Sequence, residues 1–278
     1  MDFPENLIQD LRITANKIRQ ESIRMVCTAG SGHPGGSLSE ADILAALYFY
    51  ALRIDPKDPQ WSDRDRLLIS KGHACPGWYA ALALRGYFPM EELSTFRQIN
   101  SRLQGHPDMK KTPGVEMTAG PLGNGLAGGA GIALGARIQK KDFHTFVLIG
   151  EGDFQEGCTW ESIMFSGFQK LSNLTCIFDY NDSQVDGPAH EILDVNPIKE
   201  KWLAFNWDFR EIDGHDMVQI LEALVWAKES NEKPSVIFAR TTKGKGVSFM
   251  ENQAAWHGKA PNNEQAERAL KELQAELM

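Results

Sequence analysis

The 278-residue sequence has little cysteine, no cluster of basic residues and no long hydrophobic run. Its longest uninterrupted apolar run is Ile43 to Leu52, whereas a membrane-spanning helix needs about 18 apolar residues or more. The first five residues lack the basic and apolar segments of a secretory signal. The four cysteines show neither CxxC spacing nor a disulfide framework, which is typical of a reducing compartment. We therefore expect a cytoplasmic protein with no membrane partner.

Acidic residues outnumber basic ones by 37 to 29, and the formal net charge is −8. Nucleic acids and anionic membranes attract positively charged surfaces, so neither is expected as a partner. Hydrophobic residues make up 42% of the chain, which excludes a disordered protein. The length suffices for a large core. We expect a single domain over residues 1–278 that ends in a helical extension over 263–278.

The pattern of apolar residues predicts an α/β fold. Mainly apolar runs predict strands at 67–70, 145–149, 174–179 and 235–240, and a less apolar one lies at 209–212. Continuous apolarity indicates strands buried on both faces, as in a parallel sheet covered by helices. Predicted helices lie near the N-terminus and at 40–52, 123–138, 160–171 and 217–230. The prediction is a doubly wound, mostly parallel sheet flanked by helices.

Four loops interrupt this pattern, at 27–39, 103–124, 181–197 and 243–261. In doubly wound folds, ligands bind where such loops gather at the carboxyl ends of the strands. Five of the seven histidines have a glycine neighbour: His33, His73, His106, His215 and His257. Glycine permits close approach of the backbone, and imidazole offers a donor, an acceptor and a titratable proton. These two properties suit the binding of a polar ligand. The alternative is a histidine whose hydrogen bonds are made within its own loop, and we retain this alternative for His215.

Two other ligand classes fit these histidines and glycines poorly. The histidine spacings match no zinc motif, and HExxH is absent. The segment 129–135 has the glycines of a dinucleotide fingerprint with one extra spacer, but a loop precedes it instead of a strand. We therefore predict a helix of small residues there, against which a neighbouring helix or subunit packs closely.

Polar residues follow two of the predicted strands. Gly150, Glu151 and Gly152 come after one strand, and Asn181 and Ser183 follow the next. A carboxylate and an amide that converge can hold a hard cation such as Mg²⁺ or Ca²⁺. The adjacent glycine lets a backbone N–H approach a phosphate on that cation. The pattern predicts a metal-bridged diphosphate, and two ordinary turns are the alternative.

These motifs together resemble the transketolase family. The resemblance rests on AGSGHPG at 29–35, SKGHA at 70–74, GHP at 105–107, TAGPLGNG at 118–125 and WHG at 256–258. They occur in the family's order, and the stretch from Gly150 to Asn181 looks like its thiamine diphosphate motif. The match extends from about residue 6 to 262.

The resemblance implies a role for each matching residue. The residues expected to contact thiamine diphosphate are His73, Gly120, Leu122, the backbone at Gly152, Asn181 and His257. Glu151, Asn181 and the carbonyl of Ser183 would hold Mg²⁺ or Ca²⁺. His33, His106 and His257 would face the donor sugar as catalytic groups. Glu156 and Glu161 match acidic residues at the family's subunit interface.

Two departures from the family qualify these expectations. Glu151 stands where the family has aspartate, so its extra methylene changes the expected metal geometry. The chain also ends soon after the first domain of a transketolase. We expect the N-terminal subunit of a split enzyme, whose partner carries the pyrimidine-binding and C-terminal domains in an assembly such as α₂β₂. The expected reaction is ketol transfer between sugar phosphates. The alternatives are action on an unusual sugar phosphate or a sulfonated sugar, and a non-catalytic binding or regulatory homologue.

Overall fold

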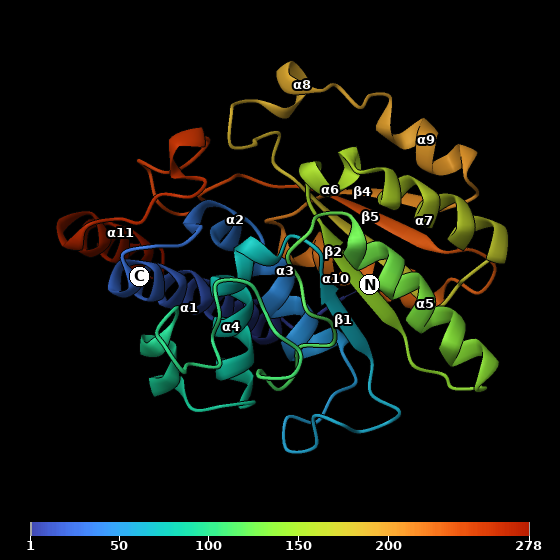
Figure 1. The fold of residues 1–278 in the computed structure, drawn as a ribbon, viewed down its shortest axis with the longest axis horizontal. Coiled ribbons are helices and arrows are strands. Elements are labelled where there is room, and N and C mark those ends of the chain that lie inside the picture. The colour runs from blue at the N-terminus through green and yellow to red at the C-terminus, as the bar shows by residue number, and fades with distance from the viewer. Residues whose placement is uncertain (1, 278) are drawn as a thin grey trace.

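The computed structural model describes residues 2–277 and contains a five-stranded sheet. The strands are β1 (Arg66–Ile69), β2 (Thr145–Ile149), β3 (Leu174–Tyr180), β4 (Asp208–Asp213) and β5 (Ser235–Arg240). They lie in the order β1-β2-β3-β5-β4, and every neighbouring pair is parallel. Helices lie on both sides of the sheet (Figure 1). The predicted doubly wound α/β fold is therefore confirmed.

The two faces of the sheet carry separate hydrophobic cores. One face is covered by α1 (Glu5–Ala29), α3 (Ala41–Ala46), α4 (Cys75–Arg85) and α10 (Met217–Glu229). The other is covered by α5 (Asn124–Ile138), α7 (Gly157–Gln169) and α9 (Ile198–Ala204). Phe146 and Leu148 of β2 join the first core, whereas Val147 and Ile149 join the second. This burial on both faces explains the continuous apolar runs.

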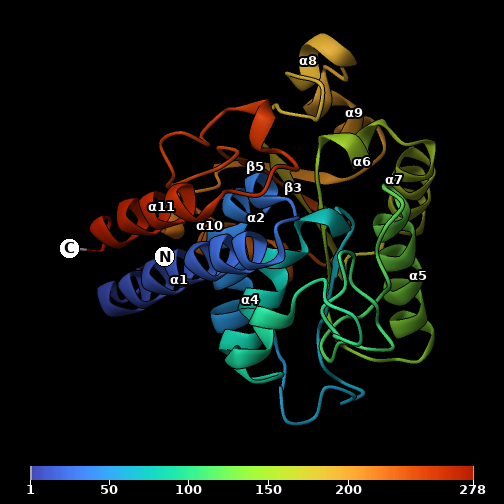
Figure 2. The same cartoon turned by 60° about the vertical axis from the view of Figure 1, so that its left-hand side comes forward.

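The last helix, α11 (Asn263–Ala275), packs along α1, and the two lie side by side in Figure 2. Its first turn is closed by Asn262, whose side chain accepts a hydrogen bond from the backbone N–H of Gln265. Its buried face joins Ile23 of α1 and Trp256 in a third core. This helix lies in the predicted extension 263–278, of which residue 278 is outside the described residues. Among the described helices, none has the length and apolarity needed to cross a membrane.

The region 27–52 differs from the prediction. The predicted loop 27–39 is helical at both ends, because α1 continues to Ala29 and α2 spans Pro34–Ser39. All residues of α2 are buried, and such burial stabilises helices too short to form alone. The predicted helix 40–52 changes from α3 into a π-helical turn, η1 (Leu47–Ala51). The Tyr48 carbonyl in that turn accepts a hydrogen bond from Nε of Arg85 at 3.0 Å, a side-chain contact that the local sequence does not show.

Several other segments had no predicted counterpart. Helix α4 has no amphipathic pattern in the sequence, because every residue from Cys75 to Ala83 is buried and the helix lacks a polar face. The remaining short segments are η2 (Gly72–Ala74), η3 (Met90–Thr95), α6 (Glu151–Gln155), α8 (Ala189–Ile192), α9 (Ile198–Ala204) and η4 (Ala254–Trp256). Most of these segments lie in or beside the loops that gather at one edge of the sheet.

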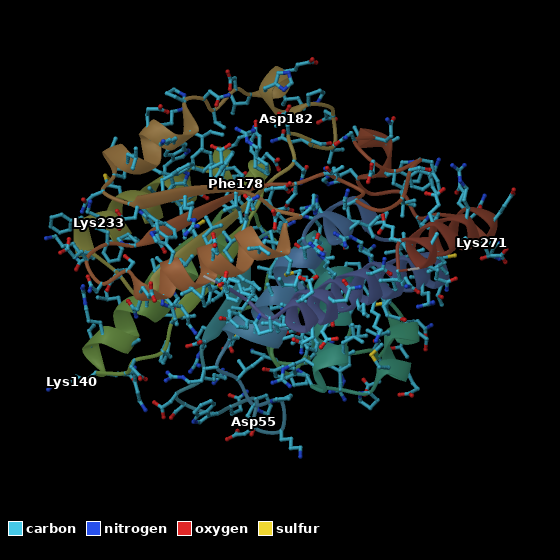
Figure 3. The ribbon with its side chains drawn as sticks, turned by 180° about the vertical axis from the view of Figure 1, so that it is seen from behind. Asp55, Lys140, Phe178, Asp182, Lys233 and Lys271 are labelled. Carbon is cyan, nitrogen blue, oxygen red and sulfur yellow. The ribbon has the colours of Figure 1, made fainter. Side chains whose placement is uncertain are left out.

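The strand register places those loops together. Ile149 pairs with Phe178, and Tyr180 pairs with Arg240. The segments after β2, β3 and β5 therefore leave the sheet at the same edge. Figure 3 shows Phe178 within the molecule and Asp182 at this edge, opposite the end that carries Asp55.

Candidate active site

A cavity of about 390 Å³ opens at the carboxyl edge of the sheet. It is lined by His33, Gly36, Lys71, His73, Leu122, Gly150, Glu151, Gly152, Asp153, Gln155, Glu156, Asn181, Ser183, Gln184, Val185, Asp186, Lys243 and His257. These residues come from the segments that follow β1, β2, β3 and β5 and from the loop after α1. The position is the one expected for a ligand site in a doubly wound fold.

Three histidines from three separate segments meet in this cavity. The ring centroids of His73 and His257 lie 5.1 Å apart in a stacked arrangement. The ring of His33 lies 5.2 Å from that of His73 and 5.6 Å from that of His257. Their contact brings residues 224 positions apart in the sequence, 33 and 257, into one wall of the cavity.

All three imidazoles are held in the neutral form. Burial lowers the pKa of His33 to about 4, and the nearby charge of Arg97 acts in the same direction. Burial lowers the pKa of His257 to about 3, with a further contribution from Lys243. The pKa of His73 is also lowered well below its ordinary value by burial and by His257. A neutral imidazole has one donor and one acceptor nitrogen, so this wall can both give and accept hydrogen bonds at neutral pH.

Glu151 connects the segments that follow β2 and β3. Its Oε1 accepts hydrogen bonds from the backbone N–H groups of Asn181 and Asp182, the latter at 2.6 Å. Burial, followed by the negative charge of Asp179, raises the pKa of Glu151 to about 7. Oδ1 of Asn181 is buried and has no hydrogen-bond partner among the described residues. The two residues predicted to converge are therefore adjacent.

Lys243 connects the 181–183 segment with the loop that carries His257. Its Nζ donates hydrogen bonds to the carbonyl oxygen of Ser183 at 2.7 Å and to Nδ1 of His257 at 2.6 Å. Burial lowers the pKa of this ammonium to about 8, and the nearby negative charge of Glu151 opposes that shift. In the sequence, Lys243 is only the first residue of a predicted loop, although the histidine motif in the same loop is an available signal.

The carboxylate of Asp153 accepts hydrogen bonds from three loops. Its Oδ1 accepts hydrogen bonds from the hydroxyl of Ser70 and from the backbone N–H of Gly123 at 2.8 Å, and its Oδ2 accepts one from the N–H of Gly150 at 2.9 Å. Burial raises its pKa, and the hydrogen bonds oppose that shift. Asp153 therefore joins the loops after β1, before α5 and after β2, whereas Glu151 contacts the segment after β3.

A buried ionic cluster lies beneath the cavity. Nζ of Lys71 lies 2.8 Å from Oε2 of Glu40 and also pairs with Asp179, which accepts a hydrogen bond from Ser39 at 2.7 Å. Both carboxylates are fully buried. No sequence pattern predicts this cluster, because its members come from three distant segments and only Lys71 stands in one of the histidine and glycine motifs.

Glycines allow the segments of the site to approach closely. A Cβ atom on Gly72 would lie 2.7 Å from Cβ of Ala119, and one on Gly152 would lie 2.8 Å from a methyl group of Leu122. In the small-residue helix α5, a Cβ on Gly129 would lie 2.3 Å from Val147 of β2. The predicted close packing at 129–135 is thus against the sheet, while added Cβ atoms on Gly131 and Gly135 would meet open space.

The predicted site residues divide into two groups. Those that line the cavity are His33, His73, Leu122, Glu151, Gly152, Glu156, Asn181, Ser183 and His257. Three predicted residues lie outside that lining: Gly120, His106 and Glu161. The backbone N of Gly120 would lie 3.4 Å from a Cβ on Gly72, beside His73. His106 is exposed, and Glu161 lies on the outer face of α7.

The metal prediction rests on a mixed set of oxygens. Among residues 2–277, no group of three or more His, Cys, Asp or Glu side chains is arranged to hold a metal ion. The set predicted here combines one carboxylate, one amide oxygen and one backbone carbonyl. Such oxygen donors suit Mg²⁺ or Ca²⁺ better than zinc.

Comparison with known proteins agrees with the fold. The thiamine diphosphate-binding domain of transketolase matches residues 11–276. The chain is 43% identical to a 6-deoxy-6-sulfo-D-fructose transketolase subunit from a Clostridium species, over 96% of this chain and 97% of the relative. It is 38% identical to one of the subunits of the apulose-4-phosphate transketolase of Phocaeicola vulgatus, over 96% and 94% respectively.

A solved structure shows the same similarity in three dimensions. The transketolase of Campylobacter jejuni superposes with a TM-score of 0.90 at 35% identity, covering 99% of this chain and 43% of that one. The similarity includes the segments that form the cavity, because it spans nearly the whole chain. Fold, sequence and the domain match together show that the chain belongs to the transketolase family and corresponds to its thiamine diphosphate-binding domain.

Proposed function

We propose that the chain is the N-terminal subunit of a two-subunit transketolase and forms a single domain. With its partner it transfers a two-carbon ketol group from a ketose phosphate donor to an aldose phosphate acceptor. The observation that carries this proposal is the meeting of three neutral imidazoles with Glu151 and Asn181 in one cavity. The relatives named as transketolase subunits align over nearly their whole length, which supports the division into two polypeptides.

The cavity fits the diphosphate of thiamine diphosphate. His73, His257 and the backbone N–H of Gly152 would hold its oxygens, and Gly120 and Leu122 would border its rings. A side chain on Gly152 would collide with Leu122, so glycine keeps the backbone accessible. Lys243 adds positive charge beside His257 in the cavity lining, which favours an anionic ligand.

Mg²⁺ or Ca²⁺ would be held by Glu151, Asn181 and the carbonyl of Ser183. The buried Oδ1 of Asn181 has no hydrogen-bond partner among the described residues, and an unsatisfied buried oxygen is costly unless a ligand engages it. The buried carboxylate of Glu151 also lacks a salt-bridge partner within 4.0 Å among residues 2–277. A divalent cation would satisfy both side chains.

The histidines are suited to proton transfer and to sugar binding. Thiamine diphosphate, when bound, supplies the nucleophilic carbon and the electron sink for carbon–carbon bond cleavage. His33, His106 and His257 would orient the sugar hydroxyls and serve proton transfer, which requires imidazoles that are not permanently charged. The lowered pKa values of all three satisfy that requirement.

The partner subunit would carry the pyrimidine-binding and C-terminal domains, in an α₂β₂ assembly. An apolar surface on α7 supports an interface there, because Met164, Phe165 and Phe168 are 54%, 40% and 81% exposed. Glu161 shares this face at helical spacing, while Glu156 precedes the helix and lines the cavity. Exposed apolar patches of this kind mark protein–protein interfaces.

The proposed location of the protein is the cytoplasm. The four cysteines are unpaired, which supports this location.

The similarity to a 6-deoxy-6-sulfo-D-fructose transketolase subunit favours a second candidate function. In that case the donor carries a sulfonate where the first candidate has a phosphate, and the ketol transfer itself is the same.

Reconstitution with the partner tests this proposal. The chain would be co-purified with a candidate second subunit, and ketol transfer would be measured with thiamine diphosphate and Mg²⁺. We expect transfer only from the mixture, and a comparison of fructose 6-phosphate with 6-deoxy-6-sulfofructose identifies the donor class. Full activity of the chain alone would refute the two-subunit proposal, and an inactive mixture with every donor would refute ketol transfer.

A further inference from the structure

The position of Lys243 determines which nitrogen of His257 carries its proton. Nζ of Lys243 lies 2.6 Å from Nδ1 of His257. A lysine ammonium has three donors and no acceptor. Nδ1 must therefore present its lone pair to Lys243. The single proton of the neutral imidazole is then on Nε2.

The lysine side chain is fixed from several directions. It is only 3% exposed, and its Nζ is also bound to the carbonyl oxygen of Ser183 at 2.7 Å. The N–H of Gly244 donates to the carbonyl of Gly35 at 3.0 Å, and the N–H of Asn252 donates to the carbonyl of Lys243 at 2.9 Å. A Cβ on Gly35 would lie 3.1 Å from Cγ of Lys243. The ammonium is thus held against His257 by its backbone, by its stem and by the segment after β3.

Nε2 of His257 remains available to a ligand. Among residues 2–277, no side chain or backbone group forms a hydrogen bond with this nitrogen. The ring lines the cavity and stacks on His73, while His33 contacts it edge-on. A protonated Nε2 can donate to a diphosphate oxygen or a sugar hydroxyl oxygen, whereas an unprotonated Nε2 would repel an anionic oxygen.

We propose that Lys243 is a positioning residue that fixes His257 as its Nε2–H tautomer and links it to the carbonyl of Ser183. The chain would thereby present a hydrogen-bond donor to an oxygen-rich ligand from one side of the cavity. The same link connects the loop of His257 to the segment proposed to hold the metal ion. This inference refines the role of a residue within the proposed site, and its spectroscopic test does not depend on the proposed reaction.

The tautomer can be measured directly in the isolated chain. In a protein labelled with ¹⁵N-histidine, long-range ¹H–¹⁵N correlation spectra distinguish a protonated ring nitrogen from an unprotonated one, and His257→Gln assigns the signals. We expect an unprotonated Nδ1 and a protonated Nε2 in the unmodified protein and in Lys243→Arg, which keeps a donor. Lys243→Met should give a mixture of tautomers.

Lys245→Met is the matched control, because it removes the same charge two residues along the loop. Lys245 lies 3.8 Å from Glu251 and does not contact His257. We expect its His257 signals to be unchanged. A protonated Nδ1 in the unmodified protein would overturn the proposal, as would an unaltered tautomer in folded Lys243→Met. The spectrum of the unmodified protein decides the question even if that variant does not fold.

A kinetic measurement on the complex with its partner provides the second readout. We expect Lys243→Met to lower kcat/KM for the donor about tenfold or more, the effect of one lost hydrogen bond of about 1.5 kcal/mol, and Lys243→Arg to restore most of it. Equal activity of Lys243→Met and the unmodified enzyme would contradict the functional part of the proposal. If the complex shows no ketol transfer at all, the proposed function fails while the spectra still test the tautomer.

Discussion

Glu151 and Asn181 lie against each other, although 30 residues separate them in the sequence: Oε1 of Glu151 accepts the backbone N–H of Asn181. The same oxygen accepts the N–H of Asp182. Among the described residues none forms a hydrogen bond with Oε2, so this second oxygen remains for a cation.

Removing the charge of Glu151 should separate these two roles. In Glu151→Gln the amide oxygen can still accept from the backbone of Asn181, so we expect the chain to fold normally. Affinity for thiamine diphosphate in the presence of Mg²⁺ should fall about tenfold or more, because a neutral amide is a weaker ligand than a carboxylate for Mg²⁺. Isothermal titration calorimetry with and without Mg²⁺ measures this affinity for thiamine diphosphate. Glu156→Gln is the control, and a Glu151→Gln variant with unchanged Mg²⁺ dependence would contradict the assignment.

Two histidines with different positions should have different effects. His73 lies within the cavity, whereas His106 is exposed and outside its lining. We expect His73→Ala to weaken thiamine diphosphate binding about tenfold, the effect of one lost hydrogen bond to a charged group. His106→Ala should leave binding nearly unchanged and lower turnover of the complex about 100-fold, as for loss of a group that moves protons. Calorimetry and steady-state kinetics distinguish them, and an equal loss of cofactor affinity in both would be inconsistent with these roles.

Most of the sheet could be predicted because its strands carry a strong local signal. Strands β2 and β5 have the predicted ends, and the ends of the others differ by one residue. Helix α4 could not be recognised, since its buried run from Cys75 to Ala83 has neither a polar face nor the length of a membrane span. The helix α2 depends on burial by distant residues, which no local pattern records.

The site could be predicted only where a motif marked it. His33, His73 and His257 were identified by their glycine neighbours, and the structure brings them together. The buried partners of Lys71 were not predicted, because an ion pair between distant segments has no sequence period. Asp179 looked like the last residue of a strand, and Glu40 looked like the first residue of a helix.

Glu40 should make the stability of the chain depend on pH. Burial raises its pKa to about 7 from an ordinary value of 4.5, while Lys71 opposes that shift and Asp179 adds to it. The folded state thus holds this proton more tightly than the unfolded state does. The contribution of Glu40 to stability is therefore present below pH 4.5 and is lost as the pH rises towards 7.

Glu40→Gln should remove this dependence. We expect the variant to have a free energy of unfolding about 1 to 3 kcal/mol higher than the unmodified chain above pH 7, and a difference that shrinks towards pH 5. Urea unfolding at several pH values gives these free energies. Glu200→Gln, at an exposed position of α9, is the control. A constant difference between Glu40→Gln and the unmodified chain at all pH values would exclude the proposed titration.

The exposed face of α7 should be required for assembly. Glu161, Met164, Phe165 and Phe168 recur at helical spacing on this face, and Phe168 is 81% exposed. Burying a phenylalanine side chain contributes about 1.5 to 3 kcal/mol, and Phe168→Asp would place a charge in the contact instead. We expect sedimentation velocity of the reconstituted Phe168→Asp enzyme to show dissociated species. We also expect its activity to be lost and the circular dichroism of the chain to be unchanged.

Ile99→Asp changes a side chain that is 94% exposed in a loop away from α7 and should leave the assembly intact. An intact, active assembly of Phe168→Asp would show that the subunits meet on another surface, because a buried unpaired carboxylate at a contact destabilises it strongly.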